Sequence, residues 1–116
     1  MYKKNSLEVY RKATEYMKEH LFEKMHVVDI AQHCGVSCAG LEKTFSKFGE
    51  TGVMRYFLDL KLEYVAKTLK EGYMVNYLAK LLNFSSSAHL SMAFKKKYGV
   101  SPLKYKYPLM KKNMSQ

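Results

Sequence analysis

Long apolar runs and tryptophan are missing from this 116-residue chain, and cysteine and proline occur only twice each. Because the apolar runs are only a few residues long, no segment is expected to span a bilayer. Two cysteines, Cys34 and Cys38, do not make a disulfide framework, and they favour a reducing cytoplasm. The basic N-terminal residues have no apolar stretch behind them, so they do not read as a secretory signal. The composition, 47% hydrophobic and 26% charged, is that of one ordinary globular domain.

Acidic residues are also missing from the whole C-terminal portion. From Gly72 to Gln116 there are eight lysines and no acid, whereas residues 1–71 hold 12 Lys/Arg against 10 Asp/Glu. A run of one charge sign is often only a solvated face. This stretch, however, also has the apolar spacing of a packed core, so it indicates a polyanion partner and favours nucleic acid.

The residues that an enzyme or a metal site would need are not grouped in a useful way. Ser85–Ser87 and His89 could suggest a nucleophile and a base, but no acid follows Glu71 to orient the histidine. Cys34 and Cys38 match no zinc spacing, so we expect a buried Cys34 and an exposed Cys38, with a redox pair as the weaker alternative. There is no glycine-rich phosphate loop either. We therefore expect no enzyme, no metal and no cofactor.

Residues 52–70 form the longest uninterrupted helical pattern in the chain. Apolar residues recur there at the spacing of one helix face: Phe57, Leu58, Leu62, Val65, Ala66 and Leu69. Gly72 stands where a helix C-cap is expected. At about 1.5 Å per residue the helix spans roughly 28 Å, and half-sites on one face of DNA lie about 34–36 Å apart. A rod of this length suits two reading helices placed over neighbouring grooves.

A helix-turn-helix pattern precedes this rod. A packing helix is expected at about residues 7–21, with Ser6 as its N-cap. A short helix at 28–34 then runs into Gly35, which permits the positive φ of a tight turn. Val36 would plug the corner, and Ser37 would cap a second helix that reaches about residue 47. One such pattern alone has a real false-positive rate.

The pattern returns after the rod, which makes it much stronger evidence. Residues 75–82 form a short helix, Asn83 takes the tolerant turn position of Gly35, and Ser85-Ser86 open a helix to about residue 97. Gly99 then ends that helix, and Ser101-Pro102 begin another. The apolar pairs match at offsets of 48 and 49 residues: Ile30-Ala31 with Leu78-Ala79, Leu41 with Leu90, and Phe45 with Phe94.

These motifs resemble the DNA-binding domain of the AraC/XylS family of bacterial transcription regulators. The most specific matches are Leu78-Ala79, Asn83-Phe84, Leu90, Phe94-Lys95-Lys96, Gly99-Val100-Ser101-Pro102 and Tyr105-Lys106, with Tyr56-Phe57, Lys61-Leu62, Ala66 and Leu69 in the rod. The resemblance covers about residues 7–106, and the size is similar to small stand-alone members such as MarA and SoxS.

The resemblance implies an all-α fold of about seven helices. The first helix-turn-helix subdomain would occupy residues 7–49, the linker helix 52–71, the second subdomain 73–107 and a flexible tail 108–116. It implies a sequence-specific regulator that binds double-stranded DNA as a monomer through two successive major grooves. An activator that contacts RNA polymerase, located in the cytoplasm at the nucleoid, is the expected role.

The resemblance also implies which residues face DNA. In the first unit they are Ser37, Cys38, Ala39, Glu42, Lys43 and Lys47; in the second they are Ser86, Ser87, Ala88, His89, Met92, Lys95 and Lys96. Lys43 is suited to guanine N7 and O6, and Glu42 could accept from cytosine N4. Ala88 and Met92 offer only apolar contact, for example to a thymine methyl group. We therefore expect the second unit to depend on phosphate contacts and DNA shape.

Several positions depart from the family pattern. The family usually has glycine at the position of Asn83 and glycine near the position of Glu50. It usually has arginine at the position of Lys61. Because the reading positions carry few large polar residues, two alternatives stay open. One is a protein-interaction module that has kept the fold and lost specific DNA readout. The other is the DNA-binding domain of a longer ligand-responsive regulator.

Overall fold

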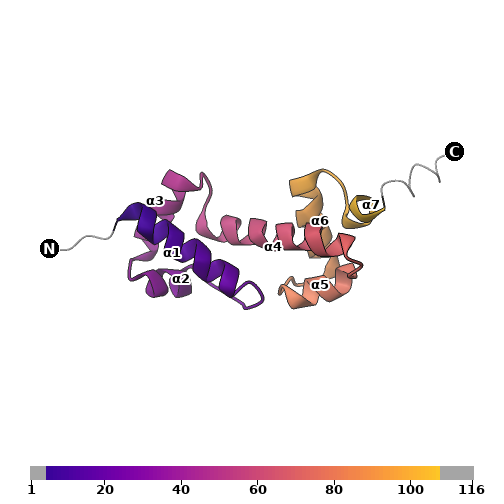
Figure 1. The fold of residues 1–116 in the computed structure, drawn as a ribbon, viewed down its shortest axis with the longest axis horizontal. Helices are drawn as coiled ribbons and strands as arrows, with labels where there is room; N and C mark the ends of the chain where they lie inside the picture. Colours follow the sequence, from indigo (N-terminus) through magenta and orange to yellow (C-terminus); the bar gives the residue numbers. More distant parts are fainter. Residues whose placement is uncertain (1–4, 108–116) are drawn as a thin grey trace. The chain divides into compact units, whose positions relative to one another are not determined.

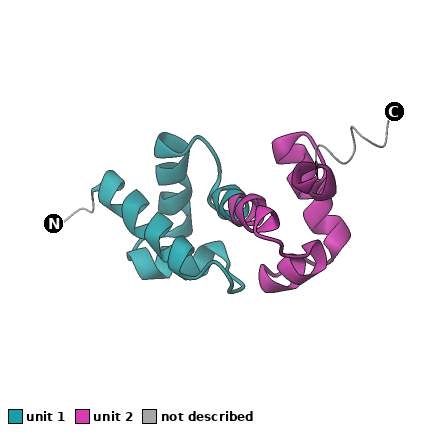
Figure 2. Cartoon of the chain, turned by 45° about the vertical axis from the view of Figure 1, so that its right-hand side comes forward, with its two compact units in different colours: residues 1–60 teal, residues 61–116 magenta. Residues whose placement is uncertain are grey.

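The computed structural model describes residues 5–107, which form seven α-helices and no strand (Figure 1). The helices are α1 (Ser6–Glu19), α2 (Val27–Cys34), α3 (Cys38–Phe48), α4 (Val53–Lys70), α5 (Val75–Leu81), α6 (Ser87–Tyr98) and α7 (Pro102–Lys106). The chain divides into two compact units, residues 1–60 and 61–116, with the division inside α4 (Figure 2). The all-α prediction is thus confirmed, while the predicted subdomain limits stay predictions and the predicted tail lies outside the described residues.

The first unit packs α1, α2, α3 and the start of α4 around one core. Its largest fully buried side chains include Met17, Ile30, Leu41 and Phe45. Tyr10 adds a half-buried ring whose centroid lies 4.9 Å from that of Phe45. Fully burying each large apolar side chain contributes about 1.5–3 kcal/mol, so apolar contact between helices holds this unit together.

The turn between α2 and α3 has the predicted chemistry. Gly35 has a φ of 69°, in the left-handed region where a Cβ would be strained. Val36 packs half-buried against the core. The Ser37 hydroxyl oxygen accepts a hydrogen bond from the Gly40 N–H at 3.0 Å and thereby caps α3.

The second unit repeats this arrangement with the end of α4, α5, α6 and α7. Buried side chains from these four helices and from the C-cap of α5 form its core: Leu62, Val65, Ala66, Leu69, Leu78, Ala79, Leu82, Leu90, Phe94 and Pro102. Asn83 has a φ of 63° and supplies the left-handed turn position predicted for it. The Ser86 hydroxyl oxygen accepts from the His89 N–H at 3.0 Å and caps α6. Ser101 caps α7 in the same way, with Pro102 in its first turn as predicted.

The first helix differs from the prediction at both ends. Ser6 was the expected N-cap, but Asn5 is the cap, because its extended backbone lets its Oδ1 accept from the Leu7 N–H at 2.8 Å. The helix ends at Glu19 instead of about Leu21. Both errors are one or two residues long, and they arise where neighbouring polar residues can serve equally well as a cap.

The internal repeat extends further than the sequence pattern indicated. Glu50, after α3, has a φ of 60°, and Gly99, 49 residues later and after α6, has a φ of 83°. The next helix of each unit then begins at Val53 and at Pro102. The two units therefore share a left-handed residue after the second helix of the motif, but only the second unit uses glycine there.

Candidate nucleic-acid interface

In the first unit, α3 exposes the side that lies opposite its buried residues. Leu41 and Phe45 face the core and are fully buried. Four candidate residues lie on the exposed side: Cys38, Ala39, Lys43 and Lys47. A spacing of four residues places Ala39, Lys43 and Lys47 along one row. This face carries the amines of Lys43 and Lys47 next to the small side chains of Cys38 and Ala39. Such amines can donate charge-assisted hydrogen bonds to a polyanion.

In the second unit, α6 exposes an equivalent face. Leu90 and Phe94 are fully buried beneath it. The exposed candidates are Ser86, Ala88, His89, Met92, Lys95 and Lys96, while Ser87 is half-buried. The structure thus leaves most of the predicted residues of α3 and α6 exposed, while Glu42 and Ser87 are half-buried.

The two exposed faces correspond residue by residue at an offset of 49. The matched pairs are Ala39 with Ala88, Lys43 with Met92, and Lys47 with Lys96. Two of these pairs keep the same side chain. The middle pair differs most, because one unit places an amine where the other places a thioether.

Glu42 has a structural role that the sequence did not reveal. Its Oε1 accepts a hydrogen bond from the Val53 N–H at 3.1 Å, across eleven residues, and the side chain is half-buried. Val53 opens α4, and Gly52 before it has no side chain with which to cap the helix. The carboxylate therefore caps α4 with a charge of the favourable sign. The predicted contact of Glu42 with cytosine stays a prediction.

His89 is held in position by its neighbours in the turn before α6. Its Nδ1 lies 3.0 Å from the Ser85 hydroxyl oxygen, and its ring meets Phe84 edge-on with centroids 5.4 Å apart. One ring nitrogen is thus engaged with the protein, which leaves Nε2 for an outside partner. The sequence analysis considered Ser85 with His89 only as a nucleophile and a base, and otherwise as a residue that opens the helix, so this positioning role was missed.

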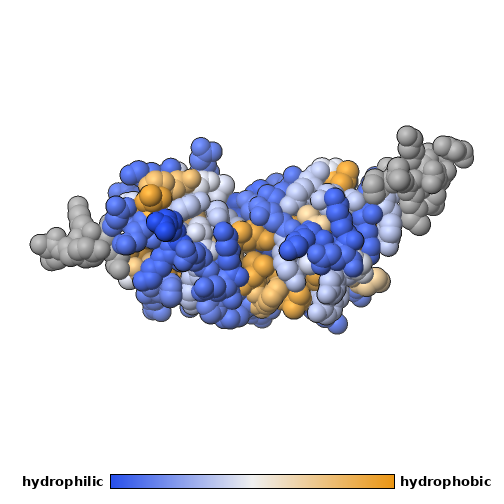
Figure 3. All heavy atoms as spheres, in the orientation of Figure 1, coloured by the Kyte–Doolittle hydropathy of each residue, from blue (hydrophilic) through white to orange (hydrophobic). Residues whose placement is uncertain are grey.

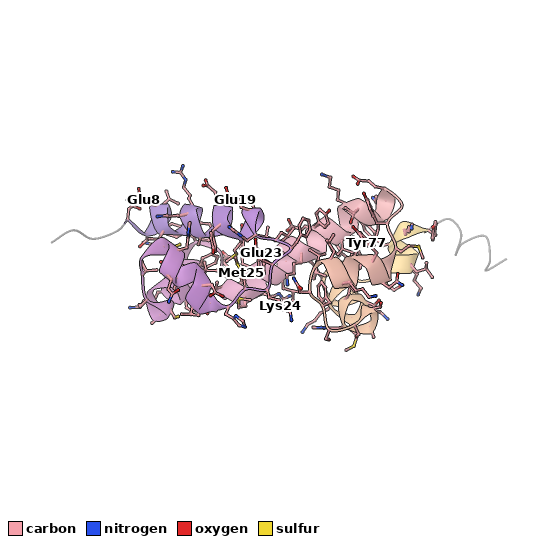
Figure 4. All side chains as sticks on the ribbon, turned by 90° about the horizontal axis from the view of Figure 1, so that it is seen from below. Glu8, Glu19, Glu23, Lys24, Met25 and Tyr77 are labelled. Atoms are coloured by element: carbon pink, nitrogen blue, oxygen red, sulfur yellow. The ribbon has the colours of Figure 1, made fainter. Side chains whose placement is uncertain are left out.

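Charge is distributed very unequally between the two units. Among residues 5–60 there are seven Lys/Arg and eight Asp/Glu, whereas residues 61–107 hold nine lysines and two glutamates. Several of the acids lie along α1 and the turn after it, including Glu8, Glu19 and Glu23 (Figure 4). Most of the face shown in Figure 3 is hydrophilic, with smaller hydrophobic areas. The second unit therefore carries most of the attraction for a polyanion.

Known proteins share this architecture. A transcriptional regulator from Chromobacterium violaceum, described as having an AraC-type DNA-binding domain, superposes with a TM-score of 0.83 at 24% identity, over 87% of this chain and 91% of that chain. A family model for a helix-turn-helix domain matches residues 12–107. The chain belongs to the AraC-type helix-turn-helix family.

Two further relatives of this AraC-type chain are informative. The uncharacterized HTH-type transcriptional regulator YidL of Escherichia coli K12 is 35% identical over 83 residues, which are 71% of this chain and 28% of YidL. The chain therefore spans less than a third of that relative's length. The DNA-binding domain of AdpA, solved in complex with a target DNA, has a TM-score of 0.76 at 20% identity, over 91% of this chain and 96% of that domain. The family consists of DNA-binding domains of transcription regulators, so the prediction that the chain is not an enzyme is confirmed.

Lys61 contacts the turn before α6 of this AraC-type domain. It stands in α4, and its Nζ lies over the Phe84 ring, 5.6 Å from the centroid. Burial lowers its pKa below the usual value of 10.5, because the charged form loses hydration. The same ring of Phe84 contacts His89. Lys61 thus connects the linker helix to the turn that positions α6, a role that the sequence signalled only as a departure from the family's arginine.

Cys34 and Cys38 have the burial that was predicted for them. Cys34 is buried and Cys38 is exposed. Among residues 5–107 there is no group of three or more His, Cys, Asp or Glu side chains that could hold a metal ion. None of the helices formed by these residues has the length and hydropathy needed to cross a membrane.

Proposed function

We propose that this chain is the DNA-binding part of a transcription regulator, in which α3 and α6 enter the major groove of double-stranded DNA. The observation that carries the proposal is the repeat: in each unit one helix, α3 or α6, buries one face in the core of that unit and exposes the equivalent opposite face. Family membership and the excess of lysine in residues 61–107 support it.

Within this proposal α3 and α6 have different roles in DNA binding. Lys43 reads guanine N7 and O6 from the centre of the α3 face, while Cys38 and Ala39 keep that face small enough for close approach. On α6, His89 presents Nε2 to a base edge or a phosphate, and Lys95 and Lys96 contact phosphates. Serines 37, 86 and 87, together with Lys47, complete the backbone contacts. Affinity then comes mainly from the second unit, and the first unit contributes more of the sequence information.

We extend the proposal to the bipartite site that the family resemblance implies. Each unit would dock its reading helix in one of two successive major grooves, so that a monomer recognises an asymmetric site. Activation through RNA polymerase at the nucleoid is the proposed outcome. Because YidL is much longer than this chain, the same domain also suits a longer ligand-responsive regulator.

Selection from randomised duplex DNA at several salt concentrations tests the proposal. The expected result is one asymmetric site with two preferred blocks about one helical turn apart. Lys43→Ala should relax the preference at one or two base pairs of one block. Lys96→Ala should weaken binding to all sequences alike and reduce the slope of log K against log salt by about one.

The outcomes separate the alternatives. Enrichment of a single block would mean that one unit reads while the other only grips phosphate. Salt-sensitive binding without any enriched site would contradict a specific regulator and favour the protein-interaction module. The small apolar side chains at Ala39 and Ala88 are the observation that keeps that second candidate in consideration.

A further inference from the structure

Met92 occupies the centre of the exposed face of α6. It is 73% exposed, the highest value among the large apolar side chains of the described residues. Ala88 lies one turn before it and Lys96 one turn after it, and both are exposed. An exposed methionine on its own is ordinary, so its position within the repeat has to carry the argument.

The equivalent position in the first unit is Lys43, 49 residues earlier, on the same row of α3. An amine there can donate to guanine. A thioether at the same place cannot donate a hydrogen bond, and its neighbour Ala88 cannot either. The polar neighbour His89 is tied to Ser85 through Nδ1. The row formed by Ala88 and Met92 is therefore apolar, while His89 lies beside this row and lysines stand at the C-terminal end of the face.

Among the four bases, thymine alone presents an apolar group in the major groove, the 5-methyl group. A methionine side chain is flexible and polarisable, so it can adapt to a methyl group at several depths in the groove. Lys95 and Lys96 would contact the backbone and hold the helix at the depth that this contact requires.

We propose that Met92, together with Ala88, makes α6 a reader of pyrimidine 5-methyl groups, so that the block of DNA facing the second unit is recognised through thymine methyls. This inference rests on the proposed DNA-binding function. Because 5-methylcytosine carries its methyl group at the same ring position, it is a second ligand of the same class. Binding at this block then responds to cytosine methylation as well as to base sequence.

The test uses the site enriched by the wild-type chain. Deoxyuridine replaces thymine one position at a time, which removes the methyl group and keeps base pairing. Dissociation constants are measured by fluorescence anisotropy at fixed salt for the wild type, Met92→Ala and the control Met54→Ala, an exposed methionine of α4 in the first unit. A further duplex carries cytosine, with or without its 5-methyl group, at the contacted thymine position.

Burying one methyl group corresponds to about a fourfold change in affinity. We expect that loss for wild type and Met54→Ala at one or two uridine positions of the second block, and no loss for Met92→Ala. Methylating the substituted cytosine should recover a similar factor with the wild type and Met54→Ala, but not with Met92→Ala. The Met92→Ala comparison separates direct contact from any change of DNA shape.

The possible results distinguish a failure of methyl reading by Met92 from a failure of the proposed DNA-binding function. An enriched site that tolerates uridine throughout the second block overturns the methyl-reading inference and leaves the proposed function standing. A uridine effect that persists unchanged in Met92→Ala overturns the assignment to Met92. If no site is enriched, the proposed function fails first, and the inference falls with it.

Discussion

Replacing Glu50 with glycine should stabilise the protein. Glu50 follows α3 with a φ of 60°, a region that costs a residue with a Cβ about 1–2 kcal/mol. Its side chain is exposed, so little packing is lost on truncation. The carboxylate also stands beside the negative end of the α3 dipole, where an acid is unfavourable. Gly99 occupies the equivalent position in the second unit and shows the conformation that glycine adopts freely.

The expected gain in the free energy of unfolding is smaller than the backbone strain energy at Glu50. Glycine gives the unfolded chain more freedom, which takes back about 0.5–1 kcal/mol. We therefore expect Glu50→Gly to raise the free energy of unfolding by about 0.5–1 kcal/mol, or the midpoint temperature by roughly 2–4 °C for a chain of this length. Urea denaturation followed by far-ultraviolet circular dichroism measures the difference.

Two controls isolate the cause. Gly99→Ala should lose about 1 kcal/mol through backbone strain alone, because its new Cβ would meet nothing within 4 Å. Glu50→Gln keeps the left-handed residue and removes only the charge, so it should gain no more than a few tenths of a kcal/mol. If Glu50→Gly is neutral or destabilising while Gly99→Ala is destabilising, the strain argument for Glu50 is refuted.

Three further changes test single contacts. Glu42→Ala leaves the Val53 N–H without its cap and should destabilise the fold by about 1 kcal/mol in urea denaturation. Glu42→Gln keeps an acceptor and should therefore lose less stability. Equal losses in the two variants would contradict the capping role. Ser85→Ala should change stability by less than about 0.5 kcal/mol but weaken DNA binding severalfold by freeing His89, and unchanged affinity would refute this positioning role. Because the pKa of Lys61 is lowered in the folded state, the unfolded chain binds more protons than the folded chain at pH values between the folded pKa and 10.5. The contribution of Lys61 to the free energy of unfolding therefore rises with pH in that range. The stability of Lys61→Met relative to wild type should therefore fall as pH approaches 10.5, and a difference that stays flat with pH would contradict the burial effect.

The fold was largely predictable because its determinants are local. The tight turns depend on the residue at one position, and Gly35 and Asn83 both adopt the expected positive φ. Ser37 and Ser101 cap helices within three residues of themselves. The buried stripes follow helical periodicity, which the sequence displays directly. The ends of α1 were less certain because Asn5 and Ser6 are both competent caps.

The reading residues were predictable only as far as exposure. Helical spacing opposite Leu41 and Phe45 requires Ala39, Lys43 and Lys47 to face outward, and they do. Which of the exposed residues touch a base depends on the DNA, so their roles stay predictions.

The sequence by itself determined the repeated helix-turn-helix architecture, the family and the exposed faces of α3 and α6, because periodicity, caps and turn residues act over a few positions. Only the tertiary structure decided that Glu42 caps α4 across eleven residues, that Lys61 lies over Phe84, and that Glu50 takes the strained place filled by Gly99 in the other unit. Contacts between segments far apart in the chain leave no periodic signal, since they form only when the packed helices bring those side chains together.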